Sequence, residues 1–149
     1  MNYLNKFSVK YTVVLFFLMV SSLLRAEAPL DVDGAETVGL KDAHRLYEEG
    51  AVFIDVRDAQ AWASGHIEGA VHLDFSTNEF SVLYVSEDLD RETPVVFYTS
   101  SPLNIRSAMA TFFAANWGYT KVYYFRDGFY SWMAADYPVD LKYSEHAAL

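Results

Sequence analysis

Cysteine is absent from this chain of 149 residues. Without a thiol, the chain forms no disulfide, carries no lipid on a leading cysteine, and has no thiolate to act as a nucleophile or a metal ligand. Small exported domains often depend on disulfides for stability. We therefore expect the packing of the core alone to stabilise this chain, and every mechanism that needs a thiol of its own is excluded.

Basic residues are scarce. The chain has 11 Lys and Arg against 20 Asp and Glu, which gives a net charge of −9 at pH 7. Three of the basic residues and none of the acidic ones lie in residues 1–26, so the remainder carries −12. Nucleic acids and anionic membranes bind basic surfaces, and we expect neither as a partner. The four histidines lack the spacing of metal ligands, and neither a metal nor a cofactor is expected.

Residues 1–26 contain the longest hydrophobic run, Thr12–Leu24, which two lysines precede. This pattern predicts a secretory signal peptide cleaved after Ala26. Cleavage after Ala28 fits the small-residue pattern better but places Pro29 beside the cut bond. The alternative is an uncleaved anchor, for which the run is short of the roughly 20 apolar residues that span a bilayer. We expect a periplasmic or secreted protein with no stable membrane span after processing.

The remaining 123 residues have the length of one domain with one core. The sequence predicts an extended lead-in over residues 27–36, the domain over residues 37–140 and a C-terminal tail over residues 141–149. Apolar runs typical of buried strands alternate with segments of helical periodicity. This alternation predicts an α/β fold with a central parallel sheet of about five strands and helices on both faces. The expected strands are Thr37–Val38, Ala51–Ile54, Val71–Leu73, Val95–Tyr98 and Lys121–Phe125.

One strand–loop–helix unit organises the sequence. Val95–Tyr98 is an apolar run typical of a buried strand, Thr99–Asn104 is a polar loop, and Ile105–Trp117 is the helix that follows. Loops at the carboxyl ends of parallel strands bind ligands in α/β folds, and free N–H groups at the start of a helix attract anions. The functional site is therefore predicted in this loop.

Three segments together resemble the rhodanese homology domain: VFIDVRDAQAWASGHIEGAVHL, VVFYTSSPLNIRSA and WGYTKVYYFRDGFYSWMAADYPV. The resemblance runs from Thr37 to Val139. It implies a sulfurtransferase fold, in which a loop cysteine takes sulfur from a donor, holds it as a persulfide and passes it to cyanide or a thiol. It also implies that Thr99 stands at the position of this cysteine and Asn104 at that of a second one, while Arg106–Ser107 keeps the family pattern.

A threonine forms no persulfide, and its hydroxyl attacks only when a base removes the proton. We therefore expect a catalytically inactive rhodanese homologue rather than an enzyme. Its former active-site loop would bind an oxyanion or a protein partner, and an exposed aromatic patch around Tyr130 is a second candidate surface. The alternatives are a vestigial loop, sulfur transfer with a borrowed thiol, and hydrolytic chemistry at Thr99. The candidate ligand-binding residues are Thr99, Ser100, Ser101, Asn104, Ile105, Arg106 and Ser107.

Five residues of the family pattern are predicted to be structural. A charge at the end of a buried strand needs a partner, so Asp55 and Arg57 are interpreted as a supporting ion pair rather than an acid–base pair. The resemblance implies that His66 and Gly69 shape a turn and that Trp132 packs in the core. None of the five is expected to carry out chemistry.

Overall fold

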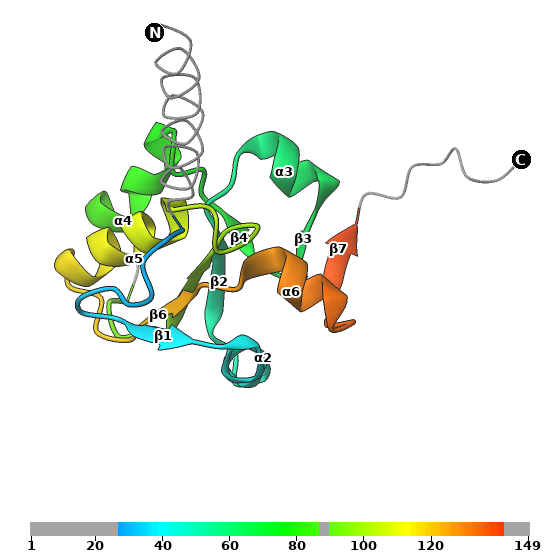
Figure 1. The fold of residues 1–149 in the computed structure, drawn as a ribbon. Coiled ribbons are helices and arrows are strands. Elements are labelled where there is room, and N and C mark those ends of the chain that lie inside the picture. The colour runs from blue at the N-terminus through cyan, green and yellow to red at the C-terminus, as the bar shows by residue number, and fades with distance from the viewer. Residues whose placement is uncertain (1–26, 87–89, 142–149) are drawn as a thin grey trace, which may run out of the picture.

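The computed structural model describes residues 27–86 and 90–141. The predicted signal peptide and most of the predicted tail lie outside these residues. The centre of the molecule is a parallel sheet of five strands in the order β1-β6-β5-β2-β4 (Figure 1). The predicted fold class is confirmed. The strands are β1 (Glu36–Val38), β2 (Val52–Asp55), β4 (Val71–His72), β5 (Val95–Tyr98) and β6 (Val122–Phe125).

Helices cover both faces of this sheet. Residues of α2 and α6 pack into the core on one face, and residues of η1, α4 and α5 pack into the core on the other. No helix in the described residues is both long and apolar enough to cross a lipid bilayer. The helices are α2 (Leu40–Glu48), α3 (Ala59–Ser64), the short 3₁₀ helix η1 (Asn78–Ser81), α4 (Val82–Val85), α5 (Arg106–Asn116) and α6 (Gly128–Ala134).

The central strands β2, β5 and β6 are largely apolar on both sides because both faces of the sheet are covered. In β5, Val96 and Tyr98 belong to the core beneath α2 and α6, whereas Val95 and Phe97 belong to the core beneath α4 and α5. The neighbouring strand β2 follows the same alternation, with Phe53 beside Val96. A strand buried on both sides shows a continuous apolar run in the sequence, which is why these strands were predictable.

Trp132 lies at the centre of the first core. It is fully buried, and its ring centroid lies 5.5 Å from that of Phe53 and 5.3 Å from that of Tyr47. The indole Nε1 donates a hydrogen bond to the carbonyl of Pro138 at 2.9 Å, as a buried tryptophan requires. Trp132 thereby joins α6, α2 and the segment before the last strand to the sheet.

A second sheet of two strands was not expected from the sequence. β3 (Gly65–Ile67) pairs antiparallel with β7 (Val139–Leu141). The sequence predicted a turn at His66 and Gly69 and a tail from Leu141, whereas Gly65–Ile67 and Val139–Leu141 are strands. The first strand also begins one residue earlier than predicted, since β1 starts at Glu36. Pairing between strands that are far apart in the chain leaves no local pattern in either one.

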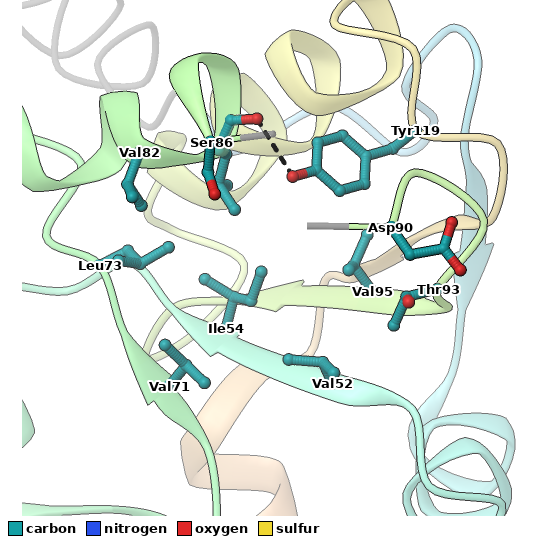
Figure 2. Close-up of a pocket in the computed structure, with 11 residues that line it drawn as sticks. Val52, Ile54, Val71, Leu73, Val82, Ser86, Asp90, Thr93, Val95 and Tyr119 are labelled. Atoms are coloured by element: carbon teal, nitrogen blue, oxygen red, sulfur yellow. Dashed lines mark hydrogen bonds between the residues drawn. The ribbon is translucent and has the colours of Figure 1, made fainter. Parts of the chain in front are cut away.

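The sheet face beneath α4 contains an apolar hollow of about 260 Å³ (Figure 2). Val52, Ile54 and Val71 line it from the sheet. Tyr119 lines it from the end of α5, and its hydroxyl donates to the carbonyl of Leu83 at 3.1 Å. This hydrogen bond fixes the short helix α4 over the sheet.

Candidate functional site

The predicted loop lies at the carboxyl edge of the parallel sheet. β5 ends at Tyr98, and α5 begins at Arg106 after an irregular segment. The start of α6, which follows β6, meets the same segment. Because parallel strands present their carboxyl ends at one edge, the fold brings together here segments that lie apart in the sequence.

Thr99, at the implied position of the family nucleophile, is fully buried. Its Oγ1 lies 3.3 Å from the Oγ of Ser107 and donates to the carbonyl of Ser101 over 3.4 Å. Ser107 is buried as well, and its carbonyl accepts from the hydroxyl of Thr111 at 2.7 Å. Thr99 and Ser107 therefore form the floor of the loop, and the Thr99 hydroxyl is closed to solvent.

The loop uses only some of its backbone groups to hold its own shape. The N–H of Asn104 donates to the carbonyl of Ser101 at 3.2 Å, and its Oδ1 accepts from the N–H of Arg106 at 3.0 Å. Other N–H groups of the loop have no acceptor in the described part of the chain, and such groups at the start of a helix bind anions. They belong to Ser100, Ser101, Ile105 and Ser107.

Arg106 places a positive charge at the mouth of the loop. Its side chain is 35% exposed, and its Nη1 lies 3.9 Å from the Oδ2 of Asp58, which also caps α3 by accepting from the N–H of Ala61. Burial opposes ionisation of Asp74, but hydrogen bonds from Ser76 and the charge of Arg106 hold the pKa of Asp74 below its ordinary value. Arg106 is thus loosely paired with carboxylates and accessible to an anion.

Gly128 allows α6 to approach the loop closely. The N–H groups of Phe129 and Tyr130 donate to the carbonyls of Thr99 and Ser100 at 2.8 and 3.1 Å. Gly128 has a φ of +73°, and a Cβ at this position would lie 2.5 Å from the carbonyl oxygen of Thr99. Only glycine fits here without moving the loop.

Gly128→Ala is expected to lower the free energy of unfolding by about 2–4 kcal/mol, because the new methyl group adds a backbone clash to an unfavourable φ. Urea denaturation measures this change. Gly39→Ala is the matched control, since Gly39 has a negative φ and no atom within 4 Å of a built Cβ. Equal losses in the two variants would contradict the close approach of α6 and the loop.

Asp55 and Arg57 form a buried ion pair behind the loop. Nη2 of Arg57 donates to Oδ2 of Asp55 at 2.6 Å and to the carbonyl of Gly65 at 2.7 Å. Burial lowers the pKa of the Arg57 guanidinium, but the hydrogen bonds and charge of Asp55 outweigh it and leave this pKa above its ordinary value. Burial also raises the pKa of the adjacent Tyr98. Through these contacts the pair joins β2 to β3.

His66 and Gly69 shape the segment between α3 and β4. The His66 ring stacks on that of Trp62 with 3.4 Å between centroids, and its Nε2 lies 3.5 Å from Oδ2 of Asp140 on β7. Gly69 has a φ of +74°. Within residues 27–86 and 90–141, no group of three or more His, Asp or Glu side chains is placed to hold a metal ion. The contacts of His66 connect α3, β3 and β7.

Tyr124 lies near the Ser107 hydroxyl of the loop, and sequence reasoning did not connect it with the candidate site. It lies on β6, is fully buried, and packs with Ala108 of α5 and Val32 of the lead-in. Among the described residues, its hydroxyl is the one buried side-chain polar atom without a hydrogen-bond partner. Burial raises the pKa of Tyr124, while the charge of Arg126 and the nearby Ser107 hydroxyl lower it. Nothing in the sequence marks it, because an aromatic residue in a buried strand is ordinary.

Comparison with known proteins places this geometry in a family. The family model described as the Rhodanese-like domain matches residues 40–135. The chain belongs to the rhodanese-like family. Thiosulfate sulfurtransferase GlpE of Pseudomonas entomophila is 38% identical to this rhodanese-like chain over 98 residues, which cover 66% of this chain and 84% of that protein.

Solved structures of rhodanese-like proteins share the fold. The polysulfide-sulfur transferase homodimer of Wolinella succinogenes superposes with a TM-score of 0.62 at 23% identity, over 78% of this chain and 85% of that one. The human single-domain sulfurtransferase TSTD1 gives a TM-score of 0.55 at 28% identity, over 68% of this chain and 97% of that one. The family resemblance predicted from the sequence is confirmed.

The prediction that this protein is not an enzyme is wrong. It rested on the missing loop cysteine alone, whereas the relatives of this rhodanese-like chain are named as thiosulfate sulfurtransferases and sulfur transferases. The family to which the chain belongs is one of enzymes. The absence of cysteine remains a chemical constraint on any sulfur transfer by this chain.

Proposed function

We propose that this rhodanese-like domain binds a sulfur oxyanion of the thiosulfate class in the loop of residues 99–107 and transfers its outer sulfur to a thiol that another molecule supplies. The observation that carries the proposal is the set of loop N–H groups without acceptors beside the accessible Arg106. These groups suit an anion at the start of a helix. The names of the relatives support the choice of thiosulfate.

The acceptor supplies the thiol for this transfer, and the chain supplies all the other groups that the reaction needs. The thiolate of the acceptor attacks the outer sulfur of thiosulfate, a new S–S bond forms, and the original S–S bond breaks with its electron pair going to sulfite. The products are the persulfide of the acceptor and sulfite. The loop N–H groups and Arg106 would orient the donor and stabilise the charge that grows on the leaving sulfite. The chain itself contributes binding, orientation and electrostatic stabilisation.

Hydrolytic chemistry at Thr99 has less support. Its Oγ1 contacts the Ser107 hydroxyl and the carbonyl of Ser101, and neither is a base able to take its proton. The oxyanion site uses the backbone and Arg106, and it does not depend on an activated threonine.

Titration with thiosulfate, sulfate, sulfite and phosphate tests the proposed site. A ligand at 100 times its dissociation constant stabilises by about 2.7 kcal/mol, which raises Tm by several degrees. We expect this rise with thiosulfate, and its loss in Arg106→Ala but not in the control Arg45→Ala, whose side chain lies in an exposed pair on α2. Thiosulfate should also release sulfite only when a thiol such as glutathione is added. The absence of both effects would refute the proposal.

We also propose that the protein is exported and cleaved after Ala26. Ala28 is buried, and its N–H donates to the carbonyl of Pro102 in the loop at 2.8 Å. Glu27 pairs with Arg126 at 3.0 Å. Cleavage after Ala28 would remove both contacts, so they favour the earlier position. The intact mass of the exported protein is expected to correspond to a chain that starts at Glu27, and a start at Pro29 would contradict this.

A further inference from the structure

A groove of about 450 Å³ runs between α5 and the lead-in. The wall on α5 consists of exposed apolar side chains, of which Ile105 is 54% and Phe112 45% exposed. Met109 and Phe113 extend the same wall. Residues 29–33 of the lead-in form the other wall, and Figure 1 shows this blue segment beside α5.

The helix α5 is apolar on both of its faces. The face towards the sheet buries small side chains such as Ala110 and Ala114 in the core. A helix at a protein surface normally turns a polar face to water, and a helix that is apolar all round is normally buried. The exposed wall of Met109 and Phe112 therefore indicates a surface that another apolar group covers.

The rim of the groove is acidic. Asp31 and Asp33 line it and are exposed, and no Lys or Arg of the described residues takes part in its lining. The chain after residue 26 carries a net charge of −12. Repulsion between like charges opposes a second copy of this chain, and it also opposes an anionic membrane. A partner with apolar side chains and nearby Lys or Arg complements both the wall and the rim.

The groove adjoins the proposed anion site. Ile105 lines the groove and directly precedes Arg106, and its own N–H is one of those without an acceptor. The lead-in joins the loop at the same place, through the hydrogen bond from Ala28 to Pro102. A segment seated in the groove therefore reaches the mouth of the loop.

We propose that the groove docks an apolar segment bearing Lys or Arg on the protein that brings the acceptor thiol to the loop. The inference rests on the proposed function, which needs a thiol from outside the chain. Docking beside the loop raises the local concentration of that thiol at the bound oxyanion. A protein with a basic, apolar segment is then a faster acceptor than a free small thiol such as glutathione.

Binding of a labelled amphipathic peptide of Leu and Lys, measured by fluorescence anisotropy at low salt, tests the groove directly. A peptide with Glu in place of Lys is the matched control and should not bind. We expect Phe112→Ser to weaken binding of the Leu/Lys peptide about tenfold. The double variant Asp31→Asn, Asp33→Asn should weaken it about three- to tenfold. Tyr84→Ser, which removes an aromatic side chain that is also exposed, should leave the affinity unchanged.

The same peptides with an added terminal cysteine test the delivery of the thiol. Sulfite release from thiosulfate should be about ten times faster with the Leu/Lys peptide than with the Leu/Glu peptide, and Phe112→Ser should remove this difference. Phe112→Ser should keep the thermal shift with thiosulfate, because Phe112 lies outside the anion site. Absence of both the thermal shift and sulfite release in the wild-type protein would refute the proposed function. Peptide binding is measured without thiosulfate and tests the groove separately.

Three results would overturn the docking proposal. The first is equal affinity of the Leu/Lys peptide for the wild-type protein and the groove variants. The second is a dimer in analytical ultracentrifugation that Phe112→Ser dissociates, which would make the groove an interface between two copies. The third is binding to phosphatidylcholine vesicles that Phe112→Ser abolishes, which would make it a lipid contact.

Discussion

Asp55→Asn is expected to lower the free energy of unfolding by about 3–5 kcal/mol. Asp55 and Arg57 are both buried, and three hydrogen bonds join the two side chains. Asparagine has the size of aspartate but no charge, so the variant leaves the Arg57 guanidinium buried without a counter-ion. The same guanidinium donates a hydrogen bond to the carbonyl of Gly65. Loss of its counter-ion should therefore also destabilise β3.

Urea denaturation followed by circular dichroism measures the Asp55→Asn effect. Glu49→Gln makes the same chemical change in the exposed pair of Arg45 and Glu49, whose atoms approach to 3.2 Å. This control should change the stability little, since water solvates both charges. A small loss in Asp55→Asn would mean that the pair does not support the fold and would reopen its interpretation as an acid–base pair.

Thr99→Cys is expected to form a persulfide with thiosulfate at least about ten times faster than an exposed cysteine does. The N–H groups around position 99 and the start of α5 favour the thiolate, which attacks the outer sulfur while sulfite leaves. Cysteine lacks the methyl group of threonine, so the buried site accepts it without strain and gains room for the outer sulfur of the donor. The variant would carry on its own chain the sulfur that the wild-type protein passes to an external thiol.

Mass spectrometry before and after a reductant detects the added sulfur atom in Thr99→Cys. Thr120→Cys is the matched control, because Thr120 is exposed and lies far along the chain from the loop. Since the chain has no other cysteine, each variant has one thiol. A folded Thr99→Cys protein that reacts no faster than Thr120→Cys would show that the loop does not activate a thiolate, and would count against the proposed anion site.

The main sheet was predictable because its strands carry their own evidence. Val95–Tyr98 is buried on both faces, so four apolar residues stand together in the sequence. The helix after Gly39 was predictable from apolar positions at helical spacing, and α2 covers that segment. Gly65–Ile67 could not be assigned in the same way, because its pairing partner Val139–Leu141 lies at the far end of the domain.

The position of the loop was predictable, but the accessibility of its side chains was not. The order of strand, loop and helix predicted where the loop lies, and the residue types predicted an affinity for anions. The hydroxyl of Thr99 was expected to take part in binding, yet the structure closes it beneath the loop. The unpaired hydroxyl of Tyr124 and the close approach of Gly128 depend on β6 and α6, which are remote from the loop in the sequence.

The sequence by itself determined that this rhodanese-like protein has no thiol, because no conformation creates an atom that the chain does not contain. It also favoured the parallel sheet, since short apolar runs alternating with helical segments are typical of strands covered on both faces. The tertiary structure alone decided which N–H groups of the loop remain without acceptors and which face of α5 stays exposed. Burial and hydrogen bonding depend on contacts between distant segments, and such contacts exist only after the chain has folded.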